Sequence, residues 1–248
     1  MSTGARLAPI VLALETSGRL AGAAVAAGTD LLGEVEVDAR RARTERLLED
    51  ARRLLDELSL GIERVAFVAF SEGPGSFTGL RVGMAAALAL AAAREIPAVP
   101  VPTLETIAFP WRLWPGPLVV VSGHRRGQVY GALYRWTMDD RFHAEIEPVS
   151  RPDQEFLDAC AGRAAGGGTG ERLLFVGDAL DSLADSIQRS FGDRARLGGT
   201  EPPRAAHVAR LALDPARPRW TKTELEGRNP LYLRDADARR PGRSGRSG

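Results

Sequence analysis

The sequence predicts an α/β protein made of two tandem β-β-β-α-β-α units, each a mixed sheet with helices packed against it. Two observations lead to this fold class. The same order of apolar strands and helices occurs twice along the 248 residues. In addition, residues 65–95 combine an apolar strand, a glycine-rich turn and an apolar helix, which is typical of a sheet covered by helices. We place the first unit at residues 1–108 and the second at residues 109–234, joined near residues 103–116.

The first unit begins with three strands, predicted at residues 9–14, 20–27 and 31–37. Polar turns separate them, Glu15-Thr16-Ser17-Gly18 after the first strand and Gly28-Thr29-Asp30 after the second. A helix is expected at residues 44–58, because one apolar stripe runs along it while charged residues occupy the other face. The stripe consists of Leu47, Leu48, Ala51, Leu54, Leu55 and Leu58.

The next stretch begins with a strand at residues 65–70, whose apolar side chains suit burial on both faces. A helix follows the glycine turn at residues 78–94, with Ser76 or Thr78 as its N-cap. From residue 82 to residue 93 it has no charged side chain, so we expect it to be buried all round. Residues spaced four apart form what we call the small-residue row: Gly79, Gly83, Ala87 and Ala91. One side of this helix can lie on the strand, and the other requires a second helix from this chain or another.

The second unit repeats the order of the first. Strands are predicted at residues 117–122, 128–136, 141–149 and 172–176, and helices at residues 152–161 and 179–191. A late helix is expected at residues 205–213. Residues 235–248 have almost no apolar side chain and are predicted to be disordered.

The composition excludes several classes of protein. It is 44% hydrophobic and 26% charged, as in ordinary globular proteins. The net charge of +1 provides no general attraction for nucleic acid or an anionic membrane. Cys160 is the single cysteine, which rules out a disulfide framework and fits a reducing compartment. The apolar run at residues 82–93 is too short to cross a bilayer, and no signal peptide is recognisable. We therefore expect a cytoplasmic protein.

The glycine turn leads into a helix N-terminus and therefore invites a phosphate-binding interpretation. The sequence of this turn does not match the specific motifs for phosphate binding or for a nucleophilic serine. Gly79 is not followed by the lysine of a P-loop, and Thr78 occupies the third glycine position of a dinucleotide fingerprint. Pro74 stands where a serine elbow around Ser76 would need glycine. A tight turn that packs the helix on its sheet is the favoured interpretation.

Metal and catalytic motifs are not recognisable in the sequence. The three histidines are widely spaced and there is one cysteine, so no zinc motif can be written and no metal is expected. No nucleophile–base pair is suggested, although catalytic triads are spatial. His124, beside two arginines, is either a cleft residue or a solvated turn residue, and we favour the second.

Glu15, Thr16 and Ser17 follow the first strand, where an acid could hold hydrated Mg²⁺ near a nucleotide. A single acid supports at most a degenerate nucleotide site at these residues.

Four segments carry a resemblance to the TsaB family. They are LALETS at the first strand, TERLL at the first helix, SEGPGSFTGLRVG at the glycine turn and RRGQVY in the second half. Residues 230–234 (PLYLR) also resemble the C-terminal end of that family, so that the likeness extends from residue 10 to residue 234. The resemblance implies an actin-like ATPase (ASKHA) fold of two ribonuclease-H-like domains, in agreement with the duplicated order.

The resemblance also implies a function. TsaB proteins are non-catalytic partners of the homologous catalytic subunit TsaD and assemble with the ATPase TsaE. Together they make threonylcarbamoyladenosine at the adenosine beside the anticodon of tRNA. The resemblance thus implies a subunit without catalytic residues that reaches tRNA through the complex. We expect a homodimer when the protein is alone, because large exposed apolar patches are rare on monomers. No cofactor is expected, although ATP or ADP could bind weakly or be shared at the interface.

The chain departs from the family pattern at three places. Thr44 stands where many members keep histidine, and the metal-binding histidine pair of the catalytic homologue is absent there. Glu15 replaces the usual aspartate, and Ser122-Gly123-His124 replaces Asp-Ala-Arg. These departures argue against Mg-ATP binding by this chain itself and leave an interaction role.

We expect the helices at residues 44–58 and 78–94 to form the docking surface for the catalytic subunit. The predicted interface residues are Leu47, Leu48, Ala51, Leu55, Gly79, Leu80, Gly83, Ala87 and Ala91. Two alternatives remain on the same fold. One is an independent glycoprotease-like peptidase, which needs a nucleophile and a base. The other is a nucleotide-binding regulatory module.

Overall fold

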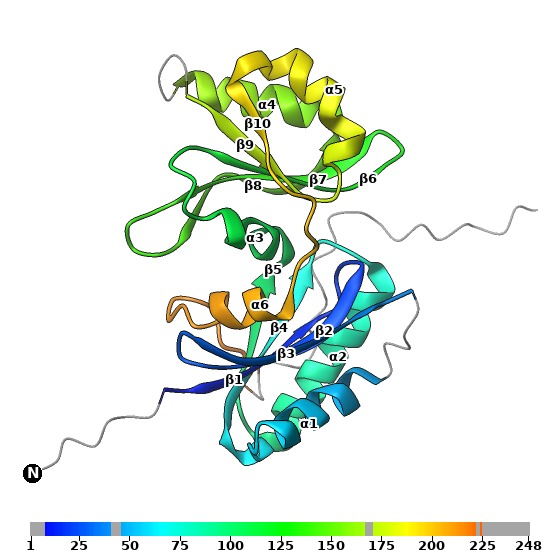
Figure 1. Cartoon of the computed structure of the whole chain (residues 1–248), viewed down its shortest axis with the longest axis vertical. Coiled ribbons are helices and arrows are strands. Elements are labelled where there is room, and N and C mark those ends of the chain that lie inside the picture. The colour runs from blue at the N-terminus through cyan, green and yellow to red at the C-terminus, as the bar shows by residue number, and fades with distance from the viewer. Residues whose placement is uncertain (1–7, 41–45, 167–170, 222–223, 225–248) are drawn as a thin grey trace, which may run out of the picture.

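The computed structural model describes residues 8–40, 46–166, 171–221 and 224. Its elements form successive layers along the long axis of the molecule (Figure 1). A sheet with helices outside it lies at each end, and two short helices lie between the two sheets. The predicted α/β class and the duplicated architecture are confirmed.

The first sheet has the strand order β3-β2-β1-β4-β5. Its strands are β1 (Ile10–Glu15), β2 (Leu20–Ala27), β3 (Asp30–Asp38), β4 (Val65–Gly73) and β5 (Ala98–Pro102). The central strand β1 pairs antiparallel with β2 and parallel with β4. Helices cover both faces of this strand, so all six of its residues are buried, including Glu15.

Helices α1 (Leu47–Glu57) and α2 (Phe77–Arg94) cover the outer face of the first sheet. Leu47 and Leu54 of α1 share one core with Val68 of β4. Of the two candidate N-caps of α2, Ser76 is the one observed, because its hydroxyl accepts a hydrogen bond from the Gly79 N–H.

The second sheet repeats this topology with the order β10-β9-β6-β7-β8. Its strands are β6 (Leu118–Arg125), β7 (Gln128–Trp136), β8 (Phe142–Pro152), β9 (Leu173–Val176) and β10 (Ala195–Leu197). Helices α4 (Asp153–Gly166) and α5 (Leu180–Phe191) pack on its outer face. Short 3-10 helices occur at η2 (Ile62–Arg64), η3 (Phe109–Trp111) and η4 (Gly192–Arg194).

The first unit is longer than predicted by one strand and one short helix, and the second by one strand. The first gains β5 and α3 (Thr103–Ala108), and the second gains β10 in front of the expected late helix, α6 (Ala205–Leu211). The sequence AVPVP of β5 contains two prolines, which discourage a strand prediction but are tolerated at a sheet edge. β10 has three residues, too few to show an alternating pattern.

The two middle helices pack on the sheet of the other unit. Leu104 and Ile107 of α3 share a core with Leu118 of the second sheet. Val208 of α6 packs on the inner face of the first sheet, near Val11. The division of the chain at residues 108 and 234 therefore differs from the packing, since each unit supplies a helix to the other.

Several smaller differences complete the comparison with the predicted elements. β4 and β6 extend beyond the predicted strand ends at residues 70 and 122, to Gly73 and Arg125, and α4 extends to residue 166. Thr44, the PLYLR segment at residues 230–234 and the predicted disordered segment at residues 235–248 lie outside the described residues.

Helix α2 is not buried all round. By length and composition it could cross a membrane, with a mean hydropathy of 1.2 over 18 residues. Its small-residue row is buried against the first sheet. A second row, Arg81, Ala85, Ala89 and Ala93, is exposed on the opposite side. Although its composition is apolar throughout, the helix therefore has two faces. One is buried against the sheet, and the described chain leaves the other uncovered.

Candidate functional site

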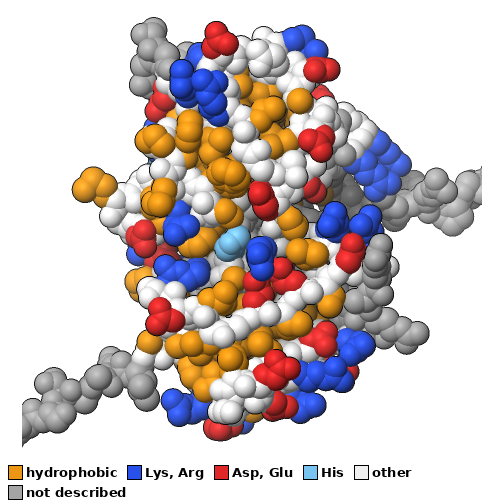
Figure 2. All heavy atoms as spheres, viewed as in Figure 1, with side chains coloured by type: hydrophobic (Ala, Val, Ile, Leu, Met, Phe, Trp, Pro, Cys, Tyr) orange, Lys and Arg blue, Asp and Glu red, His pale blue; other side chains and the backbone are white. Residues whose placement is uncertain are grey.

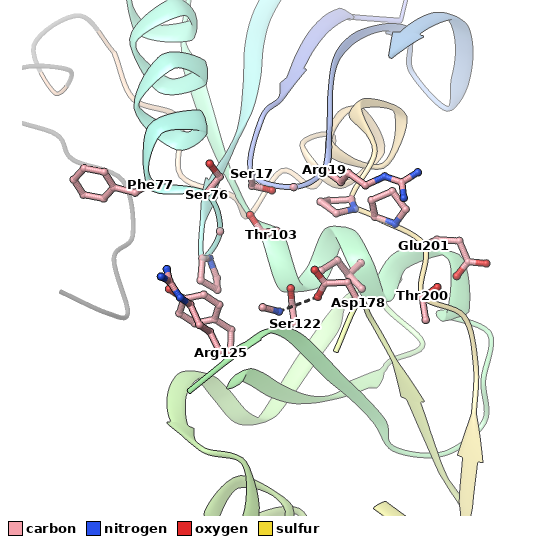
Figure 3. A pocket seen from close by; sticks show the side chains of 18 of the residues that line it. Ser17, Arg19, Ser76, Phe77, Thr103, Ser122, Arg125, Asp178, Thr200 and Glu201 are labelled. Carbon is pink, nitrogen blue, oxygen red and sulfur yellow. Dashed lines mark hydrogen bonds between the residues drawn. The ribbon is translucent and has the colours of Figure 1, made fainter. Parts of the chain in front are cut away.

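A cleft with a volume of about 800 Å³ lies between the two sheets (Figure 3). The first sheet supplies its upper wall through the β1–β2 turn and the glycine turn before α2. The second sheet supplies the lower wall through Ser122 and Asp178, and Thr103 of α3 lies between the walls. Because segments that are far apart in the sequence converge here, this cleft is the candidate functional site.

The upper wall is made by two turns that are bonded to each other. The Ser76 N–H donates to the Ser17 carbonyl oxygen at 2.8 Å. A Cβ atom added to Gly75, Gly79 or Gly83 would lie less than 3.0 Å from atoms of Thr16 or Ser17. These glycines therefore allow the β1–β2 turn to lie directly against the start of α2.

This packing corrects the prediction for the small-residue row. We expected it to receive a helix of a partner, but its space is occupied by the chain's own β1–β2 turn and sheet. Eight of the nine predicted interface residues are buried within this chain, namely Leu47, Ala51, Leu55, Gly79, Leu80, Gly83, Ala87 and Ala91. Leu48, 42% exposed, is the remaining member that a partner could reach. The periodicity identified the apolar faces correctly but not what covers them.

Glu15 lies beneath the cleft and is fully buried. One of its carboxylate oxygens accepts from the backbone N–H and the hydroxyl of Ser17, both at 2.5 Å. The other accepts from the Ser71 hydroxyl. Burial raises the pKa of Glu15, although the bonds from Ser17 and Ser71 oppose that rise.

The upper wall does not fit the Mg²⁺-nucleotide that the fold family implies. Both Glu15 oxygens are already bonded within the chain, so neither is presented to a hydrated cation. Thr16, 3% exposed, fills the space above Gly83 instead of lining the cleft. Of the three predicted nucleotide-site residues, only Ser17 lines the cleft. The turn that would cradle phosphate is filled by the neighbouring turn.

The lower wall has an equivalent arrangement. The Gly123 N–H donates to Asp178 Oδ1 at 2.8 Å, and the Ala179 N–H donates to the Val121 carbonyl oxygen at 3.3 Å. A Cβ at Gly177 would clash with that same carbonyl. In both units, a glycine thus lets the turn after the first strand lie against the turn that starts a helix.

Among the described residues, the charged side chains that line the cleft are three acids and two arginines. They are Asp178, Asp181, Glu201, Arg19 and Arg125. Figure 3 shows Arg19 and Glu201 at one end and Arg125 toward the other, with Asp178 between them. Because acids outnumber arginines, the cleft does not concentrate positive charge for a polyphosphate.

Catalytic side chains do not assemble in the described part of the cleft. Among the described residues, no three His, Cys, Asp or Glu side chains are grouped to hold a metal ion. Burial raises the pKa of the Cys160 thiol to about 12, so this cysteine is not a thiolate nucleophile at neutral pH. Burial, with Arg204 nearby, lowers the pKa of His207 to about 4, and His207 does not line the cleft.

The cleft includes residues that the sequence did not single out. Thr103 begins α3, a helix that the sequence analysis missed, and its buried hydroxyl has no hydrogen-bond partner in the described structure. Asp178 follows Gly177 at the end of a predicted strand, the place that corresponds to the glycine turn after β4 in the first unit. A comparison of the two units position by position would have found Asp178 but not Thr103.

A duplicated unit with sheet order 3-2-1-4-5, a cleft between the copies and exchanged inner helices defines a protein of the actin-like ATPase fold class. The family model of TsaD, tRNA N6-adenosine threonylcarbamoyltransferase, matches residues 33–241. The tRNA threonylcarbamoyladenosine biosynthesis protein TsaB of Bacillus subtilis is 30% identical over 92% of this chain and 95% of its own length. The chain belongs to the TsaB family.

Further relatives agree with this assignment. TsaB of Escherichia coli is 33% identical over 52% of this chain and 58% of its own length. The solved structure of YeaZ from Pseudomonas aeruginosa covers 91% of this chain and 100% of its own with a TM-score of 0.71. At 22% identity, that structure supports the fold alone.

Proposed function

We propose that this protein is a non-catalytic subunit required for threonylcarbamoyl transfer to the adenosine beside the anticodon of tRNA. Family membership supports the pathway, since the relatives are named for threonylcarbamoyladenosine biosynthesis. The cleft supports a non-catalytic role, because its upper wall is filled where a nucleotide would bind. In this proposal the protein acts in the cytoplasm by binding TsaD together with TsaE, and it reaches tRNA through that complex.

The exposed face of α2 is the observation that carries the proposed docking site. Ala85, Ala89 and Ala93 lie on one line along the helix and are exposed, with Leu48 of α1 as a further exposed apolar residue. Alanine-rich helix faces allow a second helix to approach closely. Contiguous exposed apolar surface often marks an interaction site. We assign it to TsaD in the complex and to a second copy when the protein is alone.

The surface charge favours contact with protein over direct contact with tRNA. Figure 2 shows blue and red side chains interspersed over both domains on the visible face. The net charge of +1 agrees with this pattern. Binding of nucleic acid is driven mainly by clustered Lys and Arg side chains. Any ATP or ADP required by the complex would then bind to a partner or at a shared interface.

Docking can be tested with Ala89→Arg, which places a charged side chain on the exposed face of α2. We expect the variant to unfold like the wild type, because Ala89 is exposed, but to lose co-purification with TsaD. Gln188→Arg on the exposed side of α5 is the matched control and should retain binding. Retained binding by Ala89→Arg would exclude this face. Gly83→Leu is unsuitable, since it would collide with Thr16 of the same chain.

The function itself can be tested by reconstitution with TsaD, TsaE, tRNA, threonine, bicarbonate, ATP and the synthase that makes threonylcarbamoyl-adenylate. We expect modified tRNA only when this protein is added. Modification at the same rate without it would reject the role. ATP hydrolysis or casein cleavage by the protein alone would instead favour an independent enzyme, and calorimetric binding of ATP or ADP tighter than micromolar would favour a nucleotide-binding module.

A further inference from the structure

The segment after α6 crosses from one domain toward the other and back. It comprises residues 214–220, which we call the strap. At its end, the Trp220 N–H donates to the Ala98 carbonyl oxygen at 2.7 Å, and the Ala98 N–H donates to the Trp220 carbonyl oxygen at 2.9 Å. The Trp220 ring is 8% exposed and lies 5.6 Å from the Phe70 ring. This end of the strap is therefore fixed in the core of the first domain.

The middle of the strap is tied to the helix that packs on the second sheet. Arg217 forms an ion pair with Glu105 of α3, and its Nε donates to the Leu211 carbonyl oxygen at 2.8 Å. The side chains of Arg217 and Glu105 are only 13% and 17% exposed. Because α3 is part of the core of the second domain, this pair connects the two domains.

The beginning of the strap carries a second connection. Asp214 forms an ion pair of 2.8 Å with Arg141, which lies in the hairpin between β7 and β8 of the second sheet. The strap thus contacts the first sheet at one end and elements of the second domain at two other points.

Arg217 is surrounded by groups that need a positive charge. Glu72 of β4 and Glu105 both have a pKa raised by burial, and the charge of Arg217 opposes that rise in each case. The negative charges of Asp214 and Glu147 also act on Glu105 and raise its pKa. The charges of Glu105 and Glu147 likewise contribute to the raised pKa of the buried Tyr134 hydroxyl. Removing Arg217 would leave buried carboxylates from both domains without compensation.

The strap and the cleft lie on different sides of α3. Thr103 and Ile107 of this helix line the cleft, whereas Glu105 lines a second cavity together with Arg217 and Asp214. Helix α3 stands between the two sheets. The Arg217–Glu105 pair on its far side therefore controls how far the sheets can separate on the side of the cleft. We propose that the strap pins the two domains at one angle, with Arg217 as the pin, and so holds the cleft at a fixed opening.

The angle can be measured with spin labels at Glu57→Cys on α1 and Gln188→Cys on α5, both exposed positions in different domains. Cys160 is fully buried and should stay unlabelled. We expect the wild-type background to give a narrow distance distribution in double electron–electron resonance. Arg217→Met should broaden this distribution and shift it to longer distances.

Arg219→Met is the matched control. It removes the same charge from the same segment, but Arg219 lies over the Phe67 ring of the first domain, 4.2 Å from its centroid. Its distribution should match the wild type. An unchanged distribution in Arg217→Met, or equal broadening in Arg219→Met, would overturn the proposal.

A double variant keeps the test valid if Arg217→Met is too unstable to study. In Arg217→Met with Glu105→Gln, one unpaired carboxylate is removed but the connection is not restored. We expect this variant to recover thermal stability relative to Arg217→Met while its distance distribution stays broad. A narrow distribution in the double variant would mean that Arg217 serves charge balance alone, and would reject the pin.

Discussion

Single residues decide how the upper wall of the cleft is built. Gly83 is buried one helical turn into α2, with the Thr16 hydroxyl above it, and Glu15 is held by Ser17 and Ser71. Each of these side chains bonds to or packs against its own chain. The residues that most resemble a nucleotide site are therefore used to join two turns.

Gly83→Ala tests this role directly. The added methyl group would overlap Thr16, so we expect a loss of about 1–3 kcal/mol in the free energy of unfolding. Urea denaturation measures the loss. Combining it with Thr16→Ala should return part of the stability, because the overlapping hydroxyl is removed. Ala85→Leu, on the exposed side of the same helix, should change the stability little, and an equal loss there would contradict the explanation.

Glu36 of β3 and His207 of α6 have opposite effects on how stability changes with pH. Burial, with Glu34 nearby, raises the pKa of Glu36 to about 7. The folded state then binds more protons than the unfolded state, so this term lowers stability as pH rises from 4.5 to about 7. His207, whose pKa is lowered to about 4, raises stability as pH increases from about 4 to 6.5.

Glu36→Gln should separate these two terms. With the glutamate removed, stability measured by urea denaturation should rise more steeply between pH 4.5 and 6.5 than in the wild type, because the Glu36 term no longer opposes the His207 term. Arg204 forms ion pairs with both Glu34 and Glu36. An unchanged or shallower pH dependence in Glu36→Gln would show that Glu36 is not protonated in the folded protein near neutral pH.

At the scale of the element, α2 shows how an apolar sequence can serve two faces. Its 18 residues carry almost no amphipathic pattern, yet Gly79, Gly83, Ala87 and Ala91 face the sheet while Ala85, Ala89 and Ala93 face outward. The sequence predicted this helix and named Ser76 as one of two candidate caps, because both are local features. It could not predict which of two similar rows faces inward, since glycine and alanine differ little in hydrophobicity.

The short elements were harder to predict for a related reason. β5 contains prolines and β10 has three residues, so neither shows the alternation that identifies a strand. Both form because a neighbouring parallel strand supplies hydrogen-bond partners from far along the chain. The long elements, such as β2 and β7, were predicted at their observed bounds, because their apolar residues and flanking turns lie close together in sequence.

At the scale of the whole molecule, the domains depend on each other's helices. Val11, Ala13 and Phe67 on the inner face of the first sheet are covered by α6, which lies nearly one hundred positions beyond the predicted boundary at residue 108. A chain ending at that boundary would expose this apolar face to water. The two domains are thus one folding unit in terms of the surface they bury.

A truncated protein of residues 1–108 should therefore fail to fold as a soluble monomer. We expect it to aggregate or to bind 8-anilinonaphthalene-1-sulfonate, because the face normally covered by α6 is exposed. A chain of residues 1–221, which retains α6 and the strap, is the control and should unfold cooperatively. Cooperative unfolding of a monomeric 1–108 fragment would contradict the interdependence of the domains.

The sequence by itself determined the fold class, the family resemblance and the positions of the long helices and strands. These follow from periodicity, turn residues and motifs, which are written in consecutive residues. Only the tertiary structure decided that the glycines of α2 pack against the β1–β2 turn and that both carboxylate oxygens of Glu15 are hydrogen-bonded within the chain. It also decided that each inner helix packs on the sheet of the other unit. Each of these depends on which surfaces meet in three dimensions, and close packing lets only one neighbour occupy a given face.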